Sequence, residues 1–237
     1  PVVAALAAVL REPVLWITAR PEDARTVADS LAAYLAHPER LHLMPAPDAL
    51  PYERIPWDPA TREQRMAALA SLSRWDGAGT AGTAPVIAAS VRALMVCTLP
   101  PQVFAEHSVV LRTGERHPVT ELLRRLAAQG YEIVSAVTEA GQAAHRGGIL
   151  DVFPPSDPLP TRIEWFGDEI DSLRRFNPGS QRSLREVSEV LVVPASEALA
   201  SAAQPGALDA AHRSLGRLHP IAQVEIQRQL EHLARGE

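Results

Sequence analysis

The pattern of apolar residues changes near residue 105, and this change constrains the fold more than any other feature of the chain. Before that point, short apolar runs alternate with stretches of helical periodicity, such as Val27, Leu31 and Leu35. Strands that alternate with helices predict an α/β fold with a parallel sheet and helices on its faces. The predicted strands are 14–17, 41–44 and 86–89, and the predicted helices cover 2–10, a segment beginning near 21, 63–72 and a segment beginning near 90.

After residue 105 the chain becomes rich in strand-like runs. One amphipathic helix is predicted at 119–128, and a hairpin signal, Gly167-Asp168-Glu169, joins the last two of three consecutive strand-like runs. This block predicts a small α+β unit built on an antiparallel sheet. A strand at 190–193 and a final helical, alanine-rich segment then suggest that the end of the chain completes the first domain. The predicted strands of the block are 108–111, 132–137, 148–153, 162–166 and 170–176.

Lysine is absent from the 237 residues, so all 23 basic residues are arginines, against 28 acidic residues and a net charge of −5. Without lysine the chain has no phosphate-binding loop of the G-x-x-x-x-G-K-[ST] type and no lysine base or Schiff base. The single cysteine, Cys97, excludes an internal disulfide and is expected to be buried and inert among apolar neighbours. No apolar run approaches the length of a membrane span, and we expect a soluble, cytoplasmic protein.

Other candidate sites have ordinary explanations. The glycine-rich segment 76–84 is read as a linker in preference to a phosphate site. The histidines lack the spacing of a helical zinc site, and the acids Asp168, Glu169 and Asp171 are read as a solvated turn in preference to a magnesium site. No cofactor, metal or catalytic residue is expected.

The run Arg162 to Phe166 places unusual residues on one face of a strand. Since side chains alternate along a strand, Arg162, Glu164 and Phe166 share one face, and Ile163 and Trp165 share the other, apolar face. An aromatic residue exposed beside an arginine is typical of the centre of a protein interface. The alternative is that Phe166 folds under the neighbouring turn.

Three sequence blocks resemble the N-terminal UvrB-homology module of the bacterial transcription-repair coupling factors (Mfd). They are Arg146 to Ser156 (RGGILDVFPPS), Pro160 to Arg174 (PTRIEWFGDEIDSLR) and Gln181 to Ser183 (QRS), with support from Leu50-Pro51-Tyr52-Glu53, Gln64-Arg65 and Gly130-Tyr131. UvrB itself is the nearest alternative. UvrB would carry a phosphate-binding lysine and a tyrosine-rich hairpin, whereas this chain has no lysine and three tyrosines.

The resemblance implies a non-catalytic module with a degenerate RecA-like (P-loop NTPase-like) domain that is discontinuous. Residues 1–105 and 191–237 would form this domain, and residues 106–190 would be an inserted domain that binds UvrA. The residues that would contact UvrA are Arg146, Arg162 and Phe166. We expect Arg162→Glu or Phe166→Ala to abolish UvrA binding without unfolding the domain.

The resemblance also implies that the full-length protein is an ATP-driven DNA translocase that links stalled RNA polymerase to nucleotide excision repair. Its motor and its contacts with RNA polymerase and DNA would lie downstream of this chain, and its C-terminal domain would mask the UvrA-binding surface. Two other classes stay open: an ATP-dependent, UvrB-like helicase fragment, and a DNA-binding module that uses Arg174, Arg175, Arg182 and Arg185. The acids between these arginines favour a charge-mixed, solvated sheet over a DNA-binding surface.

Overall fold

The computed structural model divides the chain into two compact units, Pro1–Glu197 and Ala198–Glu237. Leu50–Glu53, most of the glycine-rich segment, and positions Ile221 and Leu233 of the last predicted helix lie outside the described residues, whereas Val224 and Leu230 are helical as expected. The structure describes residues 1–48, 57–75, 77, 84–199, 213, 215, 216, 223, 224, 226–228, 230 and 231.

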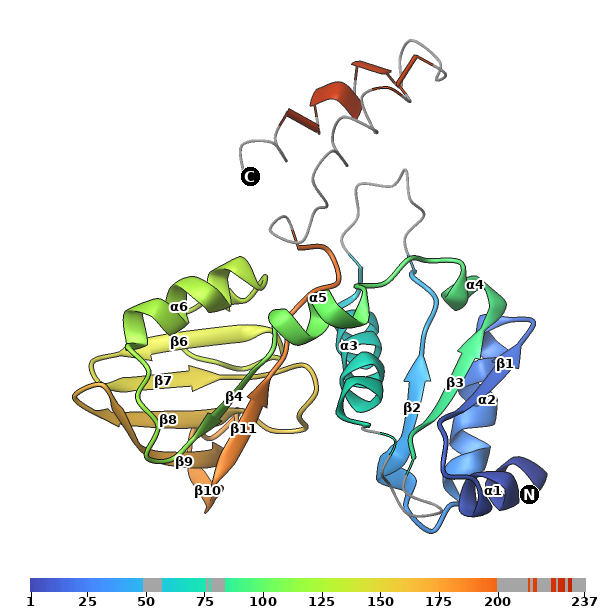
Figure 1. Cartoon of the computed structure of the whole chain (residues 1–237), viewed down its shortest axis with the longest axis horizontal. Coiled ribbons are helices and arrows are strands. Elements are labelled where there is room, and N and C mark those ends of the chain that lie inside the picture. The colour runs from blue at the N-terminus through green and yellow to red at the C-terminus, as the bar shows by residue number, and fades with distance from the viewer. Residues whose placement is uncertain are drawn as a thin grey trace. The chain divides into compact units, whose positions relative to one another are not determined.

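Three strands form the predicted parallel sheet, in the order β1-β3-β2 (Figure 1). Val86, Ala88 and Ala89 of the central strand are fully buried, because helices cover both faces of a parallel sheet. The α/β reading of this part of the chain is therefore confirmed. The strands are β1 (Val14–Thr18), β2 (Leu41–Met44) and β3 (Val86–Ser90).

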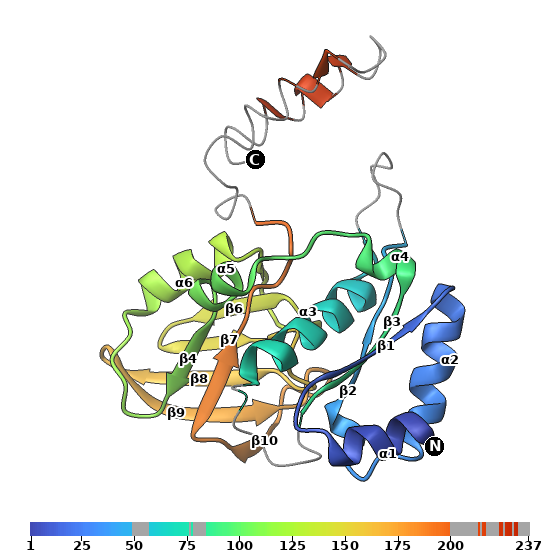
Figure 2. The same cartoon turned by 45° about the vertical axis from the view of Figure 1, so that its right-hand side comes forward.

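The two faces of this sheet are covered by different helices (Figure 2). Ala4, Ala7, Leu31 and Leu35 from the first two helices and the following turn pack around Val86 on one face. The third helix places Ala68 against Ile87 and Ala89 on the other face. It begins earlier than expected because Asp58 caps it, accepting a hydrogen bond from the Ala60 amide at 3.0 Å. These helices are α1 (Val2–Val9), α2 (Pro21–Ala32) and α3 (Pro59–Arg74), and a 3-10 turn spans Pro38–Arg40.

The prediction for Cys97 is wrong, because this side chain is exposed. The helix that follows β3, α4 (Val91–Leu94), is a single turn, and of the run Ala93 to Cys97 only Ala93 is buried. A second short helix, α5 (Pro101–Glu106), follows with Phe104 buried and was not expected from the sequence. No helix in the described part of the chain has the length and apolar character that crossing a membrane requires.

A six-stranded sheet with the order β10-β9-β8-β7-β6-β5 forms the second part of the first unit. All neighbouring strands are antiparallel except β5 and β6, which are parallel. The predicted α+β block is thus confirmed, but β6 and β10 were missed, because their polar and alanine residues resemble loops until a neighbouring strand supplies hydrogen bonds. The strands are β5 (Glu132–Ile133), β6 (Gln142–Arg146), β7 (Ile149–Val152), β8 (Thr161–Phe166), β9 (Glu169–Phe176) and β10 (Ser183–Glu186).

The strand expected at 190–193 does not join the parallel sheet. It is β11 (Glu189–Val192), and it pairs antiparallel with β4 (Val109–Arg112) as a separate two-stranded ribbon. Its buried residues Val190 and Val192 contribute to the core of the second sheet, because β11 pairs with β4, whose Leu111 belongs to the same core. The predicted boundaries of the inserted domain, near residues 105 and 190, remain a prediction.

The two faces of the six-stranded sheet differ: a helix covers one face, and the other carries charged side chains beside a smaller apolar cluster that includes Ala144 and Phe176. Helix α6 (Val119–Ala128) buries Leu122 and Leu126 against the covered face, together with Leu150, Ile163 and Leu173 of the strands (Figure 1). Strand residues between these point to the opposite face, since side chains alternate along a strand. This opposite face carries the predicted site and is called the open face below.

Tyr131 anchors the chain after β11 to the end of α6. Its hydroxyl donates a hydrogen bond of 2.7 Å to the Val193 carbonyl, and burial raises the pKa of this hydroxyl well above its usual value.

We expect Tyr131→Phe to lower the free energy of unfolding by about 1–2 kcal/mol at neutral pH, because the Val193 carbonyl loses its donor. Above about pH 10 the unfolded tyrosine ionises first, so the wild type loses this advantage and the two unfolding curves converge. Urea unfolding at pH 7 and pH 11 measures both effects, and an unchanged difference at pH 11 would contradict the assignment.

Candidate protein-binding site

The three residues predicted to bind a partner lie on the open face of the six-stranded sheet. Arg162 and Phe166 belong to β8, and Arg146 is the last residue of β6. The register places Arg146 opposite Ile149, and Asp151 opposite Arg162, so all four side chains emerge on the same face. Phe166 lies four residues beyond Arg162 on that strand, roughly 13 Å along it.

Arg162 is held by a buried carboxylate. Its Nε and Nη2 each donate a hydrogen bond of 2.8 Å to the two oxygens of Asp151, whose side chain is only 2% exposed. Its guanidinium carbon lies 4.8 Å from the centre of the Phe176 ring, in cation–π geometry. The hydrogen bonds with Asp151 raise the pKa of Arg162 above its usual value. Arg162 is therefore charged and fixed, and its side chain is 20% exposed.

Arg146 presents most of its guanidinium to solvent. Its side chain is 62% exposed, and its Nη2 lies 3.8 Å from Asp151 Oδ2, which is beyond hydrogen-bonding distance. Arg146 and Arg162 line the same hollow of about 400 Å³ on the open face. An exposed arginine with unused donors can form bidentate contacts with a carboxylate of another protein. The hollow is lined by Ala136, Arg146, Ile149, Asp151, Arg162 and Gln181.

Phe166 is the last residue of β8, and it is exposed where the hairpin between β8 and β9 turns. Phe166 is 84% exposed, so the alternative that it folds under the neighbouring turn is wrong. The turn continues through Gly167, whose positive φ of 64° suits glycine. An apolar ring exposed to this degree gains free energy when a partner covers it.

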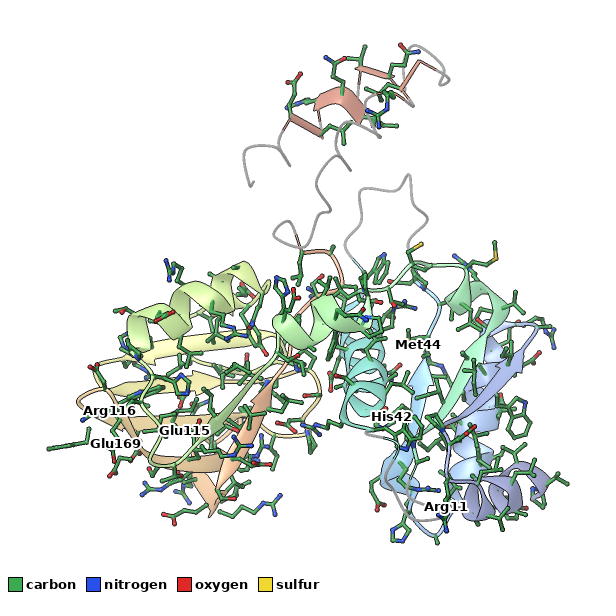
Figure 3. All side chains as sticks on the ribbon, in the orientation of Figure 1. Arg11, His42, Met44, Glu115, Arg116 and Glu169 are labelled. Atoms are coloured by element: carbon green, nitrogen blue, oxygen red, sulfur yellow. The ribbon has the colours of Figure 1, made fainter. Side chains whose placement is uncertain are left out.

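The segment 114–117 braces the end of this hairpin. The His117 amide donates to the Asp168 carbonyl at 2.9 Å, and the Ile170 amide donates to the Glu115 carbonyl at 2.9 Å. Figure 3 shows Glu115, Arg116 and Glu169 at this end of the sheet, where Arg116 Nε lies 3.9 Å from a Glu169 carboxylate oxygen. The hairpin is thus bonded to the segment 114–117 at two backbone positions next to the exposed Phe166.

The two faces of β8 are as predicted. Ile163 is fully buried in the core, and Trp165 packs against that core while its Nε1 donates to the His117 carbonyl at 2.9 Å. The register shifts between Glu164 and Trp165, which places Phe166 opposite Glu169 at the turn. Arg162 and Phe166 are thus separated from their apolar neighbours, as predicted.

Two of the four arginines considered for DNA binding, Arg174 and Arg175, are paired with acids. Arg174 lies 3.4 Å from Glu164 and 3.3 Å from Glu186, and Arg175 lies 2.9 Å from Asp157. Such pairs favour the charge-mixed reading of this surface, because phosphate binding requires unpaired positive charge. Within the described residues, no group of three or more His, Cys, Asp or Glu side chains is placed to hold a metal ion.

Sequence reasoning missed two residues of the site, Asp151 and Ile149. Asp151 holds Arg162, and Ile149 is 38% exposed between Arg146 and Glu164 in the cross-strand register. The signal was the alternation in 149–152, where Ile149 and Asp151 share one face and Leu150 and Val152 share the other.

Residues 109–197, which include both antiparallel sheets and α6, match the family model of the UvrB interaction domain. This match defines the class of domain that carries the open face. The chain as a whole is similar to transcription-repair-coupling factors, as the sequence blocks indicated.

Three of these relatives differ in how much of the chain they cover. The Myxococcus xanthus protein is 34% identical over 241 residues, which is 99% of this chain and 20% of the relative. The Bacillus subtilis protein is 32% identical over 81% of this chain and 16% of the relative. The Escherichia coli protein is 40% identical over 47% of this chain and 10% of the relative. The chain therefore spans a fifth or less of the length of these relatives.

Proposed function

We propose that this chain is a non-catalytic protein-interaction module that binds UvrA and serves in transcription-coupled repair as part of a longer protein. The observation that carries the proposal is Phe166, exposed on a braced hairpin and on the same face as Arg146 and Arg162. An exposed aromatic anchor with arginines nearby is the composition of a binding hot spot. Similarity to transcription-repair-coupling factors supports the biological setting.

The proposal includes an architecture in which residues 1–105 form a degenerate RecA-like domain and residues 106–190 form an inserted domain. The parallel sheet β1-β3-β2 supports the first part, and the antiparallel sheet supports the second. The absence of lysine from the sequence supports a fold that lacks its phosphate-binding residue. Assignment of 191–237 to the first domain stays a prediction, and β11 contributes no strand to that domain's sheet.

In the longer protein, we propose that the motor, the RNA polymerase contacts and the DNA contacts lie in other regions. The C-terminal domain of that protein would mask the open face until UvrA recruitment is needed. An exposed aromatic residue such as Phe166 gives masking a physical reason, because uncovered apolar surface promotes unwanted association.

We expect Phe166→Ala to weaken binding of purified Myxococcus xanthus UvrA at least about 30-fold, the loss typical of a hot-spot aromatic residue. Calorimetric titration of UvrA into the whole chain measures the affinity, and circular dichroism checks that the variant is folded. Tyr34→Ala is the matched control, because Tyr34 is also an exposed aromatic residue but lies after α2, in the predicted first domain. Equal binding by wild type and a folded Phe166→Ala variant would reject this site.

A further inference from the structure

Asp151 is the buried charge around which both arginines of the site are arranged. Both of its oxygens accept hydrogen bonds of 2.8 Å from Arg162, and Oδ2 also lies 3.8 Å from Nη2 of Arg146. With 2% of its side chain exposed, Asp151 offers almost no surface that a partner could cover. Any effect of Asp151 on binding must therefore act through the two guanidinium groups.

The three side chains leave one net positive charge at the hollow. Asp151 occupies Nε and Nη2 of Arg162, whose Nη1 makes one long contact of 3.5 Å with the Gln181 carbonyl. Stacking on Phe176 and the paired hydrogen bonds to Asp151 fix the plane of this guanidinium. Without Asp151 the plane would be held by Phe176 and the Gln181 contact alone.

We infer that Asp151 is a positioning residue for partner binding, which orients Arg162 toward an acidic surface of UvrA. This inference rests on the proposed function, because it concerns how the same site recognises the same partner. The alternative is that the ion pair between Asp151 and Arg162 only stabilises the fold. In that case the net charge of the site, and not the orientation of Arg162, would decide the affinity for the partner.

Asp151→Asn separates these two roles because it changes charge and orientation in opposite directions. The substitution is nearly isosteric and raises the net charge of the three side chains from about +1 to about +2. A site that worked by charge alone would then bind an acidic partner more tightly. A site that works by orientation would lose affinity, because the amide cannot accept both hydrogen bonds from the guanidinium fork.

The experiment measures association and dissociation rates of purified Myxococcus xanthus UvrA with the whole chain at two salt concentrations. For Asp151→Asn we expect the dissociation rate to rise about 30-fold. We expect the association rate at low salt to stay equal or to increase, because the added positive charge attracts an acidic surface. Asp29→Asn makes the same change in net charge at an exposed position of α2 and should leave the dissociation rate unchanged.

A second variant keeps the inference testable if Asp151→Asn does not fold. Arg162→Lys preserves every charge but replaces the planar fork by an ammonium group, and we expect a dissociation rate at least about tenfold above that of the wild type. A folded Asp151→Asn variant, or failing that a folded Arg162→Lys variant, with the wild-type dissociation rate would overturn the positioning role and leave the proposed function intact. A slower association rate of Asp151→Asn at low salt would overturn the acidic character of the partner surface. Absence of UvrA binding by the wild-type chain would overturn the proposed function together with this inference.

Discussion

Arg65→Ala should destabilise this chain by about 3–5 kcal/mol, the range measured when one partner of a buried ion pair is removed. Arg65 of α3 is fully buried, and its Nε and Nη2 donate to the Glu197 carboxylate at 2.5 and 3.0 Å. Its Nη1 also donates to the Pro45 carbonyl at 2.9 Å. Removal of the guanidinium would leave a mostly buried carboxylate without a counter-charge and a backbone carbonyl without its donor.

Urea unfolding followed by circular dichroism measures this loss as a lower midpoint with an unchanged slope. Arg74→Ala is the matched control, because it removes an exposed arginine from the last turn of the same helix and should change the free energy of unfolding by less than about 0.5 kcal/mol. The double variant Arg65→Met/Glu197→Met should regain much of the lost stability, since an apolar pair leaves no charge buried. Wild-type stability of Arg65→Ala would show that the pair does not hold α3 to the chain after β11.

Arg162→Ala is the second change with a large expected effect, a loss of about 3 kcal/mol of unfolding free energy. The physical reason is again a stranded carboxylate, because Asp151 is buried and takes both of its short hydrogen bonds from Arg162. Arg162→Glu should be worse, since it places a second negative charge against Asp151. The structure therefore argues against the expectation that Arg162→Glu removes UvrA binding while the fold stays intact.

Arg146→Ala is the matched comparison for Arg162→Ala on the same face. Its exposed guanidinium makes no hydrogen bond with Asp151 at 3.8 Å, so its removal should change the free energy of unfolding by less than about 0.5 kcal/mol. Thermal unfolding of the two variants in parallel tests this contrast. Equal melting temperatures would contradict the assignment of Arg162 to a buried, structural pair. If the expected contrast is found, the folded Arg146→Ala variant is the cleaner probe of partner binding.

Apolar periodicity was sufficient to predict most of the regular elements. Alternation along 162–166 separated Ile163 and Trp165 from Arg162 and Phe166, and the structure confirms both faces. Local sequence carries this information because the geometry of a single strand determines which side chains share a face. Apolar periodicity failed to predict β6 and β10, because these segments form strands by hydrogen bonding to a neighbouring strand and have no apolar pattern of their own.

Contacts between residues far apart in the sequence could not be predicted in this way. The exposure of Cys97, the pairing of β11 with β4 and the burial of Arg65 against Glu197 each depend on which segments meet in space. Apolar periodicity describes one helix or strand at a time and carries no information on contacts between distant segments.

The sequence by itself determined the two kinds of sheet, the exposed face of 162–166 and the family resemblance, because each is carried by local pattern. Only the tertiary structure distinguished the roles of Arg146, Arg162 and Phe166. Arg162 is paired with the buried Asp151, whereas Arg146 and Phe166 are exposed. The difference arises from burial and from the register between β7 and β8, which places one arginine opposite a carboxylate and leaves the other at the end of its strand.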